Sequence, residues 1–171
     1  MTFSIVIPTK NRPQELITMF NSIIEQTRLP DQVIIIDQSH SDNLVKSSLE
    51  TLVEKTNIRL NYIHDENING LVQAKAASLR YNDCDFISFF DDDIVLESNY
   101  LEVIEEALAS NPNISGVNGV IINMPSSNFF KRLSFQLTHF GLYRDRRQNV
   151  LLSINNKAFA SIPVNVLSGG L

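Results

Sequence analysis

The segment QVIIID, Gln32–Asp37, sets four β-branched apolar residues in an unbroken row and ends on an aspartate. Such a run is typical of a strand that is buried on both faces of a parallel sheet. FSIVI, residues 3–7, has the same character, and Pro8 ends it. Arg59–His64 alternates weakly, and residues 85–90 form another short apolar run. We therefore predict four strands.

Helical patterns follow these strands. After the first strand, apolar residues recur at helical spacing, and we expect Asn11 to cap this helix with Pro13 in its first turn. Residues 41–55 and 70–81 are also expected to be helical, and Ser98 is expected to cap a helix after the fourth strand. The repeated alternation predicts an α/β fold, with a mainly parallel sheet flanked by helices on both faces.

Length and composition limit the classes of protein that this chain can represent. Its 171 residues suit one domain, and 43% hydrophobic with 19% charged residues describes an ordered globular protein. A formal net charge of -5 argues against a nucleic-acid partner bound by bulk electrostatics. Cys84 is the single cysteine, which excludes an internal disulfide and fits a cytoplasmic protein. No apolar run approaches the roughly 18 residues of a transmembrane helix.

The last third of the chain has a different character. Residues 114–123 are another strand candidate, whereas residues 124–162 mix basic and aromatic side chains without a clear period. A solvated, partly helical excursion is the favoured interpretation of this stretch. The alternative is a basic lip for a phosphate or an anionic membrane surface, which would make the protein peripheral to a membrane. Residues 164–167 are again strand-like. The sequence gives no indication of the oligomeric state.

Polar residues follow each predicted strand. They are Pro8 to Arg12 after the first, Asp37 to Ser39 after the second, Asp65 to Gly70 after the third, and Asp91 to Asp93 after the fourth. In open parallel sheets, ligands bind at the carboxyl ends of the strands. We therefore expect a ligand site where these four segments meet.

The stretch FFDDDIV, residues 89–95, places three carboxylates side by side, where each raises the pKa of its neighbours unless a positive charge lies among them. Clustered carboxylates are hard ligands for Mg²⁺ or Mn²⁺, which also need phosphate oxygens and waters. Aspartates can instead cap a helix. The next helix is expected near Ser98, more than a turn away, so we favour a metal site.

Four segments, in this order and spacing, resemble the inverting family 2 glycosyltransferases of GT-A (Rossmann-like) fold: SIVIPTKNRPQEL, IIIDQSHSD, NINGLVQAKAASL and FFDDDIVLESNYLE. The likeness extends from Thr2 to Leu171. It implies a nucleotide-diphospho-sugar donor and a glycan or lipid-linked acceptor, in the synthesis of a polysaccharide, glycolipid or cell-surface glycan. It also implies a Mn²⁺ or Mg²⁺ cofactor held by the acidic triplet.

The resemblance also implies roles for individual residues. The first segment and Asp37 would hold the base, the Asn-x-Gly segment would approach base and pyrophosphate, and Asp91 would face the ribose. Asp93, with Asp91, would ligate the metal. The spacing before Gly70 is one residue longer than usual, and Lys75 replaces the family's arginine, which leaves a point charge for phosphate. The implied nucleotide-binding residues are Pro8, Thr9, Asn11, Arg12, Asp37, Ser39, Asn67, Gly70, Lys75, Asp91 and Asp92.

Inversion requires a carboxylate that deprotonates the acceptor hydroxyl. In the family this base follows a Gly-Gly segment, whereas here Gly169 and Gly170 are followed by one residue. We therefore expect residues 1–171 to be a nucleotide-diphospho-sugar-binding domain, truncated before the acceptor-binding and catalytic-base segment. Such a chain would bind a donor with metal but transfer sugar negligibly.

Three alternatives remain open at this stage. Asp91, Asp93 and Val95 match the DxDx[TV] motif of haloacid dehalogenase-type phosphatases, although that motif normally follows the first strand. A calcium loop is weaker, because Leu96 stands where glycine is required. A nucleotide-binding module without catalysis, either a fragment or a pseudoenzyme, is the strongest alternative because no base is evident.

Overall fold

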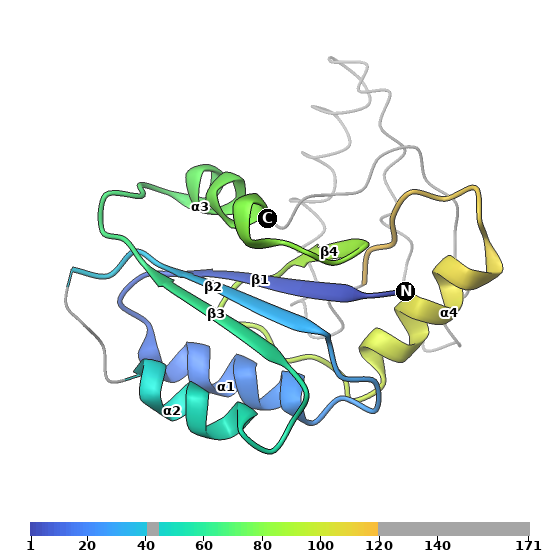
Figure 1. Cartoon of the computed structure of the whole chain (residues 1–171), viewed down its shortest axis with the longest axis horizontal. Helices are drawn as coiled ribbons and strands as arrows, with labels where there is room; N and C mark the ends of the chain where they lie inside the picture. The colour runs from blue at the N-terminus through green and yellow to red at the C-terminus, as the bar shows by residue number, and fades with distance from the viewer. Residues whose placement is uncertain (41–44, 120–171) are drawn as a thin grey trace, which may run out of the picture. The chain divides into compact units, whose positions relative to one another are not determined.

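Four parallel strands form one sheet, in the order β3-β2-β1-β4 (Figure 1). The computed structural model describes residues 1–40 and 45–119. All of its helices and strands lie in the unit formed by residues 1–110, and residues 111–119 belong to a second unit. The elements are β1 Phe3–Thr9, α1 Pro13–Ile24, β2 Gln32–Asp37, α2 Val45–Val53, β3 Arg59–His64, α3 Leu71–Ser78, the 3₁₀ helix η1 Leu79–Tyr81, β4 Phe86–Phe89 and α4 Tyr100–Ser110.

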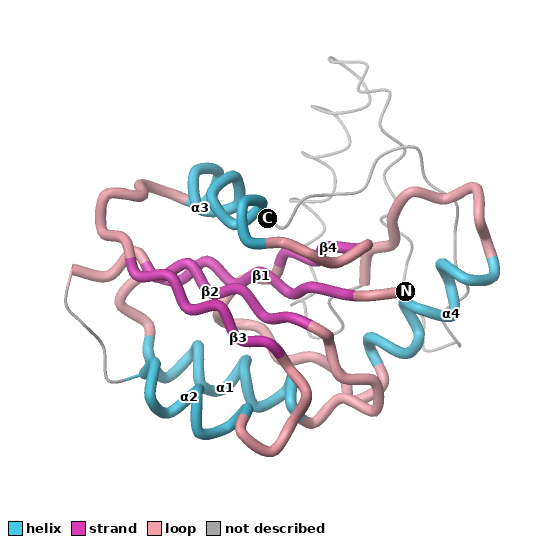
Figure 2. Tube along the Cα trace, in the orientation of Figure 1, coloured by secondary structure: helices cyan, strands magenta, loops and turns pink. Residues whose placement is uncertain are grey.

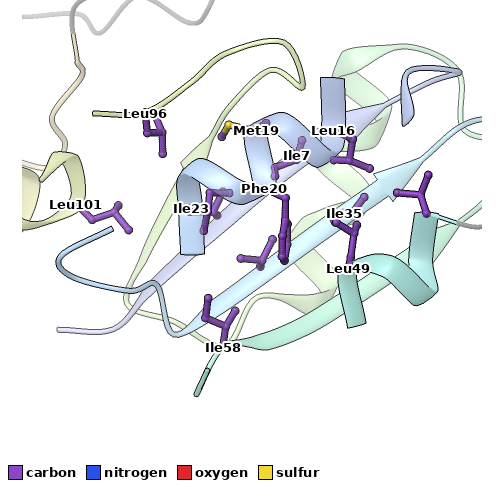
Figure 3. Packing of buried hydrophobic residues seen from close by; sticks show 13 residues of the cluster. Ile7, Leu16, Met19, Phe20, Ile23, Ile35, Leu49, Ile58, Leu96 and Leu101 are labelled. Atoms are coloured by element: carbon purple, nitrogen blue, oxygen red, sulfur yellow. The ribbon is translucent and has the colours of Figure 1, made fainter. Parts of the chain in front are cut away.

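Both faces of the sheet are covered, as the unbroken apolar runs predict. Alternate residues of a strand point to opposite faces. On one face Ile35 belongs to a cluster with Phe20 of α1 and Leu49 of α2, whose packing is shown in Figure 3. On the other face Ile34 packs in a cluster with Ala74 of α3. α1 and α2 therefore lie on one side of the sheet and α3 on the other (Figure 2), which confirms the predicted fold class.

The register brings three strand ends level with one another. Thr9 of β1 pairs with Asp37 of β2, and Asp37 pairs with His64 of β3. Every residue of β1 and β2 is buried, whereas β3, at the edge of the sheet, is half-exposed. The buried central strands thus hold the carboxyl edge of the sheet in a fixed position.

The start of α1 differs from the prediction. Asn11 was expected to cap this helix, but Arg12 occupies the N-cap position, and its carbonyl accepts a hydrogen bond from the Leu16 N–H at 3.1 Å. Pro13 is in the first turn, as predicted. Asn11 instead has a φ of 57°, in the left-handed region that asparagine tolerates better than most residues. Its backbone N–H donates to the Ser39 hydroxyl at 2.8 Å, and its positive φ differs from the extended backbone that an N-cap residue adopts.

Other boundaries shift slightly. The helix predicted over 70–81 ends at Ser78 and continues as a 3₁₀ turn, and α2 ends at Val53 rather than at residue 55. α4 begins one residue later than a Ser98 cap requires, because the Val103 N–H donates to the Asn99 carbonyl at 3.1 Å.

The strand predicted over residues 114–123 is not formed in its described part, residues 114–119. The remainder of that segment, the basic stretch 124–162, the run 164–167 and the Gly169-Gly170 pair lie outside the described residues. None of the described helices is both long enough and apolar enough to cross a membrane.

Candidate functional site

The polar segments that follow the strands leave the sheet from one edge. Backbone hydrogen bonds continue the ladder past the strand ends: the Gln38 N–H donates to the Thr9 carbonyl at 2.9 Å, and the Asp65 N–H donates to the Asp37 carbonyl at 2.9 Å. On the other side of β1, the Phe90 N–H donates to the Val6 carbonyl at 3.0 Å, directly before the acidic triplet. The structure therefore brings the predicted segments together at the carboxyl edge.

Asp92, the middle carboxylate of the triplet, is buried and anchored. Its Oδ2 accepts a hydrogen bond from Thr9 Oγ1 at 2.6 Å, and its Oδ1 accepts one from Arg12 Nη1 at 3.2 Å. A buried carboxylate is destabilising unless it is paired and hydrogen-bonded, and these two partners meet that requirement. Asp92 therefore ties the end of β4 to the loop after β1.

Arg12 supplies the positive charge that the three adjacent aspartates require. The same Nη1 that contacts Asp92 also lies 3.0 Å from Asp93 Oδ2. The Coulomb attraction of Asp92 and its hydrogen bond, and then the contacts with Asp93, raise the pKa of Arg12 above its ordinary value. The side chain of Asp93 is 54% exposed, so this second carboxylate faces solvent while Asp92 does not.

Asp91 has a different environment from the other two. It is half-buried, and no hydrogen bond or ion pair joins its carboxylate to another described residue. Across residues 1–40 and 45–119, no group of three or more His, Cys, Asp or Glu side chains is arranged to hold a metal. Two carboxylates are nevertheless what Mg²⁺ or Mn²⁺ ordinarily takes from a protein when phosphate completes the shell. Asp91 and Asp93 fit that donor set.

Asp37, at the end of β2, is the centre of a hydrogen-bond network. It is 1% exposed, and its Oδ1 accepts bonds from the Ser39 backbone N–H at 2.9 Å and the Ser39 hydroxyl at 2.5 Å. Its Oδ2 accepts a bond from Tyr62 Oη at 2.5 Å. Both carboxylate oxygens are thus engaged within the protein. Tyr62 was not identified from the sequence. It lies on the neighbouring strand β3, where it pairs with Ile35, the residue two positions before Asp37, so its side chain can reach Asp37 diagonally.

Ser39 connects this network to the first loop. Its hydroxyl accepts a hydrogen bond from the Asn11 N–H at 2.8 Å, and its carbonyl lies 2.8 Å from His64 Nε2. The position of Asn11, and with it the neighbouring Arg12, is therefore fixed by the segment after β2. His64 was not identified from the sequence, although its place at the last position of β3 was a usable signal.

The loop before α3 joins the site through its backbone. The Gly70 N–H donates to Gln38 Oε1 at 2.9 Å, and Gly70 has a φ of 84°, which favours glycine. Asn67 bonds within its own loop, because its N–H and side-chain amide both donate to Asp65 Oδ1, at 2.9 and 3.0 Å.

Lys75 of α3 also reaches the edge of the sheet. Its Nζ lies 5.5 Å from the centre of the Phe89 ring, which is the last residue of β4. A basic side chain is therefore present beside the strand that leads into the acidic triplet, and the phosphate contact expected of Lys75 stays a prediction.

Comparison with known proteins gives a consistent result. The family model described as glycosyl transferase family 2 matches residues 4–169. An uncharacterised glycosyltransferase of Haemophilus influenzae is 25% identical over 112 residues, which are 66% of this chain and 36% of that protein. The Escherichia coli UDP-Glc:alpha-D-GlcNAc-diphosphoundecaprenol beta-1,3-glucosyltransferase WfgD is 27% identical over 121 residues, 70% of this chain and 46% of WfgD. The chain thus spans less than half of the length of these curated relatives.

Solved structures share the fold. S. aureus TarS 1-349 in complex with UDP-GlcNAc superposes with a TM-score of 0.57 at 21% identity, covering 72% of this chain and 37% of TarS. The mannosyltransferase PcManGT from Pyrobaculum calidifontis, in complex with GDP-Man and Mn²⁺, gives a TM-score of 0.54 at 20% identity, covering 63% and 32%. At this level of identity the structures establish the GT-A-type fold alone. Because the family model matches nearly the whole chain, from residue 4 to residue 169, this protein belongs to glycosyl transferase family 2.

Proposed function

We propose that the carboxyl edge of this sheet binds a nucleotide-diphospho-sugar, and that the protein transfers the sugar to an acceptor with inversion. One observation carries the proposal: Asp91, Asp92 and Asp93 lie at a sheet edge beside Thr9 and Arg12, with the carboxylate of Asp91 unpaired among the described residues. TarS and PcManGT, whose folds are similar, were solved with UDP-GlcNAc and with GDP-Man and Mn²⁺.

The base would lie over the ends of β1 and β2, bordered by Pro8, Thr9, Asn11 and Ser39. Because both oxygens of Asp37 already accept hydrogen bonds, a base N–H would have to share an oxygen with Ser39 or Tyr62. The remaining nucleotide contacts are proposed for the loop of residues 67–70, for Arg12 and Lys75 on the phosphates, and for Asp91 on the ribose side.

Asp91 and Asp93 would hold Mn²⁺ or Mg²⁺, which neutralises the leaving nucleoside diphosphate when bound. Asp92 does not take part directly, because Thr9 and Arg12 already occupy its two oxygens. Its role would be to hold the loop that carries the two neighbouring carboxylates. The positive charges of Arg12 and Lys75 would add to the stabilisation of the phosphates.

A lipid-linked acceptor is supported by the name of WfgD, which acts on a diphosphoundecaprenol substrate. Such an acceptor would bring the protein to a membrane surface. The haloacid dehalogenase-type alternative is not retained, because the chain belongs to glycosyl transferase family 2 and the acidic triplet follows β4 rather than β1.

A thermal-shift panel tests the donor and metal parts of this proposal. UDP, dTDP and GDP are added with and without Mn²⁺, and the matching nucleoside monophosphates serve as controls. At a ligand concentration of 100 Kd, binding adds about 2.7 kcal/mol of stability, or roughly 5–10 °C in Tm for a chain of this size. We expect one diphosphate to reach this range only with Mn²⁺. Equal shifts with the monophosphate, or none with any diphosphate, would contradict the proposal.

A further inference from the structure

Arg12 makes two contacts of different kinds through one nitrogen. Its Nη1 lies 3.2 Å from Asp92 Oδ1 and 3.0 Å from Asp93 Oδ2. Asp92 is buried and also held by Thr9, whereas the Asp93 side chain is 54% exposed and Arg12 is its partner among the described residues. Exposed ion pairs contribute little free energy. The contact with Asp93 is therefore the one that another cation can replace.

The backbone of Arg12 is fixed while its side chain is accessible. Its carbonyl accepts the first hydrogen bond of α1 from Leu16, and the preceding Asn11 is held by Ser39. The Arg12 side chain is 52% exposed. A change of partner can thus occur by rotation of the side chain, without movement of the loop.

We propose that Arg12 is an internal cation that occupies Asp93 in the free protein and transfers to the diphosphate when metal and nucleotide bind together. The inference rests on the proposed function, which places a divalent metal at Asp93. Two cations on one carboxylate oxygen repel each other, so metal binding at Asp93 would weaken the Arg12 contact. The planar guanidinium fork matches phosphate oxygens, which provides the released side chain with a new partner.

This exchange makes metal and nucleotide binding cooperative. Without nucleotide, the metal must displace Arg12, and the guanidinium gains nothing in return. With a diphosphate present, the displaced guanidinium binds it, so each ligand raises the affinity for the other by the same factor. Arg12 would therefore oppose binding of metal alone and favour binding of nucleotide with metal.

The test compares Arg12→Ala with Arg80→Ala in the 171-residue chain. Arg80 is an exposed arginine of η1, so its variant makes the same change in net charge. Binding of Mn²⁺ alone is followed by the electron paramagnetic resonance signal of free Mn²⁺, and binding of UDP, dTDP and GDP at saturating Mn²⁺ is followed by calorimetry. We expect Arg12→Ala to bind Mn²⁺ alone about two- to fivefold more tightly, the range of an exposed ion pair. Its affinity for the nucleotide should fall about tenfold or more.

The opposite signs separate this proposal from a structural role. If Arg12→Ala weakens both ligands, or leaves Mn²⁺ binding unchanged relative to Arg80→Ala, the exchange is refuted. If the wild-type chain binds nucleotide without any requirement for metal, the metal part of the proposed function fails first, and the exchange with it. Should Arg12→Ala not fold, Arg12→Lys is used instead, because it keeps the positive charge but lacks the planar guanidinium. We then expect Mn²⁺ affinity near that of the wild type and weaker nucleotide binding, whereas equal nucleotide affinity would overturn the proposal.

Discussion

The contribution of the hydrogen bond between Thr9 and Asp92 to the free energy of unfolding can be predicted. Thr9→Val removes the hydroxyl that donates to Asp92 Oδ2 at 2.6 Å and keeps the shape of the side chain. Thr9 is 5% exposed and Asp92 6%, so water cannot easily replace the lost donor. Hydrogen bonds to charged groups contribute about 1.5–3 kcal/mol. We expect a loss of stability in the upper half of this range, or roughly 4–12 °C in Tm.

Urea unfolding followed by circular dichroism measures this effect, with an unchanged m-value as the sign that only stability has altered. Thr9→Ser is the matched control, since it keeps the hydroxyl and removes only one methyl group, at a cost of about 1 kcal/mol. The double variant with Asp92→Asn completes a cycle, in which the loss from Thr9→Val should shrink once the charge is gone. A Thr9→Val protein within about 0.5 kcal/mol of the wild type, or strictly additive variants, would refute the assignment of Asp92 as an anchored carboxylate.

Three further measurements test other parts of the structure. Asp93→Asn should abolish metal-dependent nucleotide binding while circular dichroism shows an intact fold, and unchanged affinity would remove Asp93 from the site. Asp37→Ala should weaken UDP or dTDP binding by roughly 1–3 kcal/mol in calorimetry, either because the base loses an acceptor or because Ser39 loses the carboxylate that positions it. At Asp31 burial acts to raise the carboxyl pKa, but the Phe3 N–H and Arg28 outweigh it, so the pKa is lowered. A lowered pKa means that the ionised carboxylate stabilises the folded protein, and this stabilisation is lost as pH falls through the folded pKa. Asp31→Asn should therefore make the free energy of unfolding depend less on pH below about pH 5.

The four strands of the sheet could be predicted well from the sequence, because their signal is local, although β1 continues to Thr9, past the Pro8 that was expected to end it. Gln32–Asp37 and Arg59–His64 were predicted to the residue, and their β-branched or alternating patterns need no knowledge of partners. The helix ends were less well predicted. The capping role expected of Asn11 failed because the residue has a positive φ, which an N-cap does not have. Its N–H bonds to Ser39, a residue 28 positions away that local rules do not consider.

The candidate site was predictable in its location but not in its connections. The rule that ligands gather at the carboxyl ends of parallel strands brought the right segments together. It could not show that Asp37 bonds to Tyr62, since that contact depends on which strands are neighbours. Like-charge repulsion predicted that the triplet needs a cation, but the cation in the structure is Arg12, about 80 residues earlier in the chain.

Charge at the triplet explains why an arginine and a metal can both be required there. Three carboxylates and one guanidinium leave two negative charges, which one divalent cation would neutralise. A nucleoside diphosphate would then add negative charge, and the cations that we propose to offset it are Arg12, once released from Asp93, and Lys75, beside the end of β4. The metal alone offsets the charge that Arg12 leaves on the triplet, so the charge of the diphosphate would be left to the released Arg12 and to Lys75. The three adjacent aspartates would therefore have different tasks: Asp92 holds the loop through Thr9 and Arg12, and Asp91 and Asp93 are the ones we propose to face the metal and the nucleotide.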